Sequence, residues 1–483
     1  MWICTSINSG LYIQKLVIQL PKFGSRMEST PLPQLKFRWS QPKYFRSVTQ
    51  TSVAEPQVFE TLIHMLKVSL GTGILAMPKA FSNAGYLLGI IGTLAVGALS
   101  TYTMQMLVRT EYELCKKRRV PRMTYAQTFE AAFAEGPKTF RPLARAAGVA
   151  CKIILFLFQG GACCVYIVFV AENLKAVRDF SGHYQYFGAT DIRLYMAYLL
   201  GPLILICWLR NFKYLAPVSS FGNVMTLICY CITFYYMLSD LPSFSTRQAV
   251  VELDRFPLFI GTALFAMEAV GVVMPLKSEM KNPRQFRGWF GVLNCAMVPI
   301  TILYLLVGLA GYLKYGDSAR GSISLNLPDN EVPAQCVKVM LAFSVYICYA
   351  ICAYVTFQML WGDYLEPKFE ESKKKLVYEY IGRTLLVLVT FGLAVSIPNL
   401  ELFISLIGAL GLANLGVAFP TIMEMLTRWD KYHGCLFALF LLKNFCLLFV
   451  AVYAFFIGGS TTNLISGEKV FKATAAMVCV QYT

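Results

Sequence analysis

Charged residues are scarce in this chain. Asp, Glu, Lys and Arg together make up 14% of its 483 residues, whereas 57% of the residues are hydrophobic. A soluble domain usually contains about 25% charged residues, because its surface must be polar. The shortage of charge therefore excludes an ordinary water-soluble fold for most of the chain.

Metal-ligating and catalytic patterns are also missing from the sequence. It has only three histidines, and no pair of Cys-x-x-Cys motifs provides the spacing of a structural zinc site. Most of its 15 cysteines lie in apolar runs, where Cys behaves as a small hydrophobic residue. No nucleophile, base or metal set converges in those runs. We therefore expect neither an enzyme nor a bound cofactor or metal.

Long apolar runs recur from one end of the chain to the other. Backbone polar groups in lipid must hydrogen-bond within the segment, so runs of about 20 residues predict membrane-spanning helices. We predict an all-α integral membrane protein whose transmembrane domain covers residues 59–459, between polar tails at 1–58 and 460–483. Its eleven predicted transmembrane helices are at 60–81, 85–108, 147–174, 194–209, 214–238, 257–277, 288–313, 334–361, 379–397, 399–425 and 434–458.

Lys and Arg are distributed unevenly among the predicted loops. With a cytosolic N-terminus, the cytosolic segments carry about three times as many Lys and Arg as the opposite side. Because basic residues accumulate on the cytosolic side, we predict this orientation. It also accounts for the net charge of +16 without a nucleic-acid partner. The densest basic run, residues 116–119, is interpreted as a topology signal, with binding of anionic membrane lipid as the alternative.

Glycine and proline interrupt two predicted helices at corresponding positions. The first helix contains Gly71, Gly73 and Pro78. The sixth contains Gly261 and Pro275. These residues disfavour a continuous helix, and irregular backbone at membrane depth is tolerated where it lines a cavity. Because the two helices are five apart, we predict two inverted five-helix repeats plus one extra helix, with the binding site at the breaks.

The sequence around these breaks resembles that of proton-coupled amino acid transporters, within the amino acid/auxin permease superfamily, and especially their insect members. The resemblance covers roughly residues 55–460 and implies symport of protons with small neutral amino acids. The matching stretches are His64–Lys67, Gly71–Pro78, Asn83–Gly85, Tyr112–Cys115, Phe265–Glu268, Gly271–Leu276, Met280–Pro283, Gly321–Ile323 and Leu325–Leu327.

The resemblance also implies a substrate site at the broken first and sixth helices. Free backbone N–H groups at a helix start suit the carboxylate of an amino acid, and we expect Gly71 and Gly73 to leave space for it. Lys79 stands at the mouth of this site, where the family more usually has a polar neutral residue. The substrate-binding residues implied are Gly71, Thr72, Gly73, Ile74, Phe265, Ala266 and Glu268.

Two ionisable residues are predicted to couple transport to protons. His64 is the only histidine within an apolar run, matches a family histidine and lies two helical turns before Gly71, on the same side. Histidine changes charge near neutral pH, which suits proton uptake. Glu268 lies in the middle of the sixth helix. It either relays the proton or holds the broken helix by accepting backbone hydrogen bonds.

Three further charged residues lie in the last two predicted helices. Lys443 is in the middle of the eleventh helix, and we expect it to pair with a carboxylate or a carbonyl group. Glu401 and Glu424 lie near the ends of the tenth helix, and we expect both to reach water.

Other functions remain compatible with this sequence. The same fold and site would serve an amino-acid sensor, or a sodium-coupled or facilitative carrier. The sequence is equally consistent with the plasma membrane and with a lysosomal or endosomal membrane, and it does not determine the oligomeric state.

Overall fold

The computed structural model describes most of the predicted transmembrane domain. The described residues are 61–62, 65–66, 69, 71–180, 191–209, 212–252, 254–267, 273–274, 276–277, 280, 283–286, 288, 290–361 and 374–466. Side chains are described for all of these except 178–180, 212–217, 283–284 and 457–466.

Within these residues, all regular secondary structure is helical. The long helices are α5 (Tyr86–Arg118), α7 (Ala144–Phe180), α10 (Phe212–Leu238), α13 (Val292–Tyr315), α14 (Val332–Leu360), α16 (Lys375–Ser396) and α19 (Gly434–Ser466). The shorter helices are α4 (Thr72–Ala84), α6 (Tyr125–Glu135), α9 (Ile192–Cys207), α11 (Phe256–Ala266), α17 (Leu400–Ile407) and α18 (Phe419–Thr427). A π-helical segment, η8 (Gly408–Ala418), joins α17 to α18. Short 3₁₀ turns are found at Arg141–Leu143, Phe244–Thr246, Pro283–Phe286, Gly316–Ser318, Ile323–Asn326 and Trp429–Lys431.

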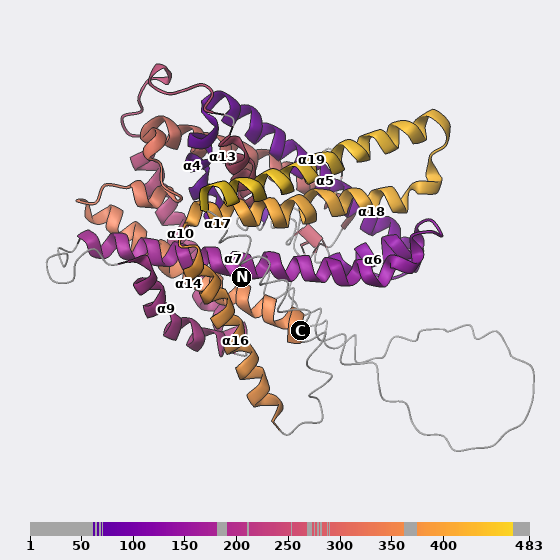
Figure 1. Cartoon of the computed structure of the whole chain (residues 1–483), viewed down its shortest axis with the longest axis horizontal. Helices are drawn as coiled ribbons and strands as arrows, with labels where there is room; N and C mark the ends of the chain where they lie inside the picture. The colour runs from indigo at the N-terminus through magenta and orange to yellow at the C-terminus, as the bar shows by residue number, and fades with distance from the viewer. Residues whose placement is uncertain are drawn as a thin grey trace, which may run out of the picture.

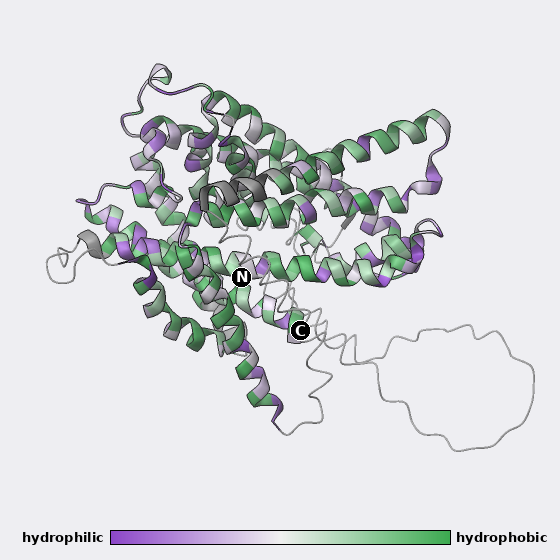
Figure 2. Cartoon of the chain, viewed as in Figure 1, coloured by the Kyte–Doolittle hydropathy of each residue, from purple (hydrophilic) through white to green (hydrophobic). Residues whose placement is uncertain are grey.

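Eight helical segments in the described part of the chain are long and apolar enough to cross a membrane. The apolar helices α9 and α11 are shorter. Hydrophobic residues cover most of the bundle helices along their length (Figure 2). The prediction of an all-helical membrane protein is confirmed at this level, whereas the count of eleven helices and the inverted repeat stay predictions. Some helices continue past the predicted ends of the membrane spans. Helix α5 ends at Arg118 instead of residue 108, because its last turns extend beyond the apolar run, and α7 and α19 also continue beyond residues 174 and 458.

The helical bundle has two ends, which we name after nearby helices. The α17 end is where α4 finishes and α17 begins, and the α6 end is where α5 and α18 finish and α6 lies (Figure 1). Helix α7 runs from one end to the other and packs along α14, which also contacts α10. Helix α4 packs closely against α11 and α13. The segment from α17 to α18 lies between α11 and α19.

Glycines allow the central helices to approach at backbone distance. A Cβ at Gly73 would overlap the backbone of Ala266, so α4 and α11 meet there without intervening side chains. A Cβ at Gly408 would overlap the carbonyl oxygen of Gly261, and one at Gly261 would overlap Ser405. Small residues at helix crossings favour such contacts in membrane proteins. Helix α11 is therefore held between α4 and the α17–η8 segment.

Candidate functional site

The first predicted helix is interrupted within the bundle at Gly71. Ser69 is helical, Gly71 is extended (φ −102°, ψ −160°), and α4 begins at Thr72. The Gly71 N–H donates to the Ser69 carbonyl at 2.9 Å. Gly71, at the N-cap of α4, has no side chain, and no side chain of the described residues accepts a hydrogen bond from the first-turn N–H groups of this helix. Together with the helix dipole, they form a local environment that favours a carboxylate.

The expected break is narrower than the sequence suggested. Gly73 and Pro78 both lie inside α4, which is continuous from Thr72 to Ala84. Proline removes a single backbone hydrogen bond, and neighbouring helices can compensate for it in a membrane bundle. Pro78 packs directly against Gly311 of α13, where no other side chain intervenes. The unwound region in the described residues is therefore limited to the vicinity of Gly71.

Gly71 and Gly73 have different surroundings, which the sequence did not distinguish. A Cβ at Gly71 would meet no heavy atom within 4 Å among the described residues, so open space adjoins the break. The space beside Gly73 is occupied by Ala266. Only Gly71 thus matches the expectation that a first-helix glycine leaves room for a ligand. Thr72 is half-buried and Ile74 is fully buried next to it.

Two buried tyrosines hold the backbone on either side of the break. The Tyr230 hydroxyl of α10 donates to the Gly71 carbonyl at 2.9 Å. The Tyr304 hydroxyl of α13 donates to the Ser69 carbonyl. These carbonyls lose helical partners at the interruption, and unpaired polar groups are costly at membrane depth. Neither tyrosine was predicted from the sequence, because a tyrosine within an apolar run has no distinguishing pattern.

Helix α11 ends beside the start of α4. Its last residues, Phe265 and Ala266, are buried, and the Met267 N–H closes the helix by donating to the Ala263 carbonyl at 3.0 Å. The structure therefore brings Phe265 and Ala266 together with the Gly71–Ile74 turn, through the contact of Ala266 with Gly73. His64 and Glu268, the two predicted proton-coupling residues, lie outside the described residues.

A small cavity lies next to the end of α11. It is bounded by α5, α11 and η8, and its only polar side chains are two hydroxyl groups on α5, one of which, on Thr103, bonds to backbone carbonyls. A π-helix in the middle of a membrane segment commonly marks a functional region. The lining residues are Ser100, Thr103, Met104, Leu264, Met267, Leu412, Gly416 and Val417.

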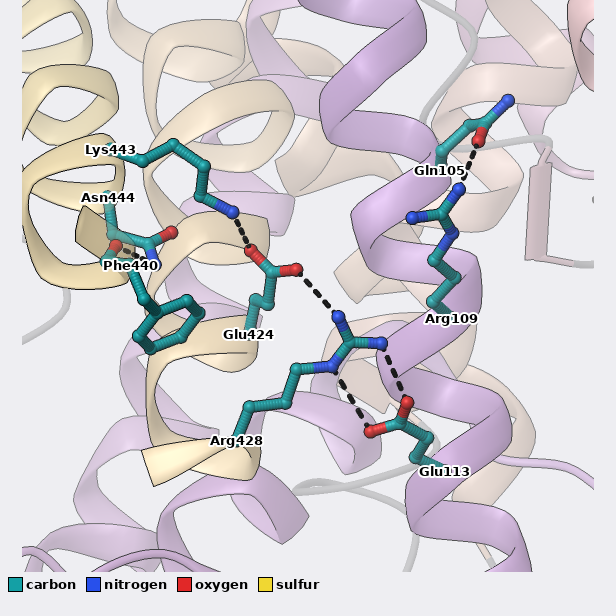
Figure 3. Close-up of polar contacts among 8 residues, drawn as sticks. All are labelled: Gln105, Arg109, Glu113, Glu424, Arg428, Phe440, Lys443 and Asn444. Carbon is teal, nitrogen blue, oxygen red and sulfur yellow. Dashed lines mark hydrogen bonds and ion pairs between the residues drawn. The ribbon is translucent and has the colours of Figure 1, made fainter. Parts of the chain in front are cut away.

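Charged side chains join three helices at the α6 end (Figure 3). Arg428 forms two hydrogen bonds with Glu113 of α5, at 2.6 and 3.3 Å, and pairs with Glu424 of α18 at 3.1 Å. The other carboxylate oxygen of Glu424 lies 2.5 Å from Lys443 Nζ of α19. The four charges alternate in sign and sum to zero. We call Glu113, Arg428, Glu424 and Lys443 the inner charge chain.

This arrangement confirms one expectation and corrects another. Lys443 pairs with a carboxylate, as predicted. Glu424 does not reach water, because it is only 4% exposed and lies between two cations. Its position near the end of an apolar run suggested exposure, but α5 and α19 pack over it.

Two more contacts close the α6 end. Glu111 of α5 forms a buried ion pair with Lys277, and its other oxygen accepts a hydrogen bond from the Cys115 thiol at 3.1 Å. At the surface, Lys117 and Arg118 pair with Glu135 at the end of α6. The hydrogen bond from Lys117 lowers the pKa of the Glu135 carboxyl, with a further contribution from the Arg118 charge.

The fold and site define a multi-pass helical membrane protein with a broken helix at its centre and charge pairs at the α6 end. The chain belongs to the transmembrane amino acid transporter protein family, whose model matches residues 55–465. The transporter family membership predicted from the sequence is confirmed.

Two relatives illustrate this membership. The chain is 41% identical to the proton-coupled amino acid transporter-like protein pathetic of Drosophila melanogaster, over 78% of each protein. It is 26% identical to the probable amino acid transporter skat-1 of Caenorhabditis elegans, over 78% of this chain and 82% of the relative.

Proposed function

We propose that this protein is a secondary active transporter that carries small neutral amino acids together with protons. The observation that carries the proposal is the start of α4. Uncapped N–H groups and open space at Gly71 lie beside the end of α11, in a chain of an amino acid transporter family. The substrate carboxylate would bind at these N–H groups, and Thr72, Ile74, Phe265 and Ala266 would contact the rest of the molecule.

Proton coupling is proposed from the sequence and from one relative. The fly relative is named as proton-coupled, and His64 and Glu268 are ionisable residues of the predicted first and sixth helices. One proton moving down a gradient of one pH unit supplies about 1.4 kcal/mol, enough for about tenfold accumulation. A zwitterionic substrate carries no net charge, so symport with one proton moves one positive charge. Each 100 mV of membrane potential then adds about 2.3 kcal/mol.

The remaining parts of the proposal concern topology and location. We place residues 1–58 in the cytosol, the transporter domain at 59–459 and the tail 460–483 on the opposite side. The membrane is the plasma membrane or that of an acidic organelle, where a proton gradient is available.

Uptake and current measurements test this function. The protein is expressed in oocytes or reconstituted into vesicles and offered a panel of amino acids at two pH values, with sodium present or replaced by choline. We expect neutral amino acids to give inward current that increases as the external pH falls and persists without sodium. Sodium-dependent current would contradict proton coupling, and binding without uptake would identify a sensor instead.

Two variants test the coupling residues. In His64→Ala, proton-driven accumulation should be lost while exchange of substrate for substrate continues. Glu268→Gln keeps the shape of the side chain but removes its charge, and a proton relay at this position predicts the same loss. Accumulation against a gradient by His64→Ala, with unchanged pH dependence, would transfer the coupling role to Glu268 if its own variant is defective.

A further inference from the structure

Three side chains bridge α4 and α17 at the α17 end of the bundle. Lys79 Nζ lies 3.6 Å from Oε2 of Glu401, and Asn83 Nδ2 donates to Oε1 of the same carboxylate at 2.7 Å. Lys79 and Asn83 are four residues apart and therefore share one face of α4. We propose that Lys79, Asn83 and Glu401 form a gate that closes the α17-end entrance to the substrate site and opens in each transport cycle. This inference rests on the proposed site at the start of α4.

The bridge lies between the site and the α17 end of the molecule. Lys79 follows Gly71 by eight residues, which corresponds to about 12 Å along the helix axis. Glu401 is in the first turn of α17, and Ser405 and Gly408, one and two turns further on, contact Gly261 of α11. The two helices that carry the bridge therefore both belong to segments that contact α11 near its end. A substrate entering between them from the α17 end would pass the three side chains.

The bridge can open without separating packed helices. Helix α4 makes its close contacts with α11 and α13, and α17 is not among the helices that pack extensively against it. Long side chains span the intervening distance instead. The Lys79 and Glu401 side chains are 21% and 20% exposed, and a partly solvated ion pair is weak. The α6 end differs, because there α5 and α18 pack closely around the more buried Arg428.

The Glu401 side of the bridge is anchored at the start of α17. The Asn399 side chain caps α17 by accepting from the Leu402 N–H at 3.3 Å. Helix α17 also packs against α7, so it is held by a second helix. Gly321, in the segment before α14, also packs against Leu400 and Glu401. Lys79 and Asn83, by contrast, lie on the helix that begins at the proposed substrate site.

A thiol at the break reports whether the gate is open. Gly71→Cys introduces the reporter in open space, and a membrane-impermeant maleimide is added to the protein in nanodiscs. Peptide mass spectrometry measures modification at residue 71 separately from the native cysteines. In this background, Glu401→Gln and Lys79→Met should each raise the modification rate, by up to about fivefold for the loss of one partly solvated pair. The double exchange Lys79→Glu with Glu401→Lys should return the rate toward that of the parent.

A matched control separates gating from general loosening. Asp329→Asn removes the 2.6 Å ion pair with Lys338, which joins α14 to the segment before it and involves neither α4 nor α17. This variant should leave the modification rate at residue 71 unchanged. Equal modification rates at residue 71 in the parent, Glu401→Gln and Lys79→Met would overturn the gate. An increase in Asp329→Asn as large as in those variants would also overturn it. The same holds if the double exchange variant keeps a raised modification rate.

The outcome is independent of the proposed transport activity. Modification at residue 71 requires no substrate and no proton gradient, so it can reveal a gate even if neutral amino acids are not carried. Conversely, normal uptake of neutral amino acids together with equal modification rates would retain the proposed function and exclude the gate.

Discussion

At the scale of single residues, two glycines two positions apart have opposite roles. Gly71 adjoins open space at the break, whereas Gly73 is in contact with the backbone of Ala266. Both residues lack a side chain, but only at Gly71 is the resulting space open to a ligand. The difference follows from the backbone, because Gly71 lies in the extended break before α4, whereas Gly73 lies within α4 where that helix meets α11.

Substitutions at these glycines should therefore separate binding from folding. Gly71→Leu should reach the membrane in near-normal amount and lose amino acid binding, because its side chain fills the space at the break. Gly73→Leu should lower stability by about 1–3 kcal/mol or more, because α4 and α11 must move apart. Surface expression, thermal unfolding and binding of labelled substrate distinguish the two. Normal substrate binding by Gly71→Leu would remove the site from this turn.

The tyrosines at the break offer a second residue-scale test. Tyr304→Phe removes one of the two donors to the buried Ser69 carbonyl, which keeps its hydrogen bond from the Gly71 N–H, at a cost of about 0.5–1.5 kcal/mol. We expect a lower unfolding temperature and weaker substrate binding. Tyr346→Phe is the matched control, since its hydroxyl donates to the Pro202 carbonyl at 2.7 Å at an exposed position. Equal losses in both variants would mean that the Tyr304 hydroxyl has no special relation to the site.

At the scale of helices, contact at backbone distance and buried charge organise the molecule. Helix α11 is held between α4 and the α17–η8 segment by glycine contacts. The inner charge chain connects α5, α18 and α19 with two acidic and two basic groups. Because its charges cancel, the inner charge chain can lie at the edge of the membrane without a net buried charge.

Charge balance predicts that substitutions in the inner charge chain have non-additive effects on stability. Lys443→Met leaves one unbalanced negative charge, and Glu424→Gln leaves one unbalanced positive charge, so each should destabilise the protein by about 3–5 kcal/mol. The double variant leaves the neutral Glu113–Arg428 pair. Its loss of stability should be clearly smaller than the sum of the single losses. Thermal unfolding of the purified variants measures this, and simple additivity would show that the two residues act independently.

At the scale of the whole molecule, the distribution of Lys and Arg predicts the orientation in the membrane. We predict that the loop containing α6 is cytosolic and that residue 483 lies on the opposite side of the membrane. An epitope tag at residue 483 should be removed by protease added to intact cells that carry the protein on their surface. A tag between residues 136 and 141 should be protected until the cells are permeabilised. The reverse pattern would contradict the orientation.

The sequence was sufficient to predict the membrane class, the helical fold, the family and the positions of most helices. These properties depend on apolar runs and on local motifs, which act within a few turns of one chain segment. The sequence also located the interruption of the first helix, but it extended that interruption to Pro78. Proline ends a helix in water more readily than in a bundle where neighbours such as α13 pack against it.

Only the tertiary structure decided which distant residues meet. Lys443 was expected to have a partner, but its pairing with Glu424 depends on how α18 and α19 pack. The same holds for Tyr304 with Ser69 and for Lys79 with Glu401, which are separated by hundreds of residues in the chain. Apolar periodicity specifies that a segment spans the membrane, but not which face of it meets which helix. That choice is made by side-chain packing and by the cost of leaving a charge or carbonyl unpaired in lipid.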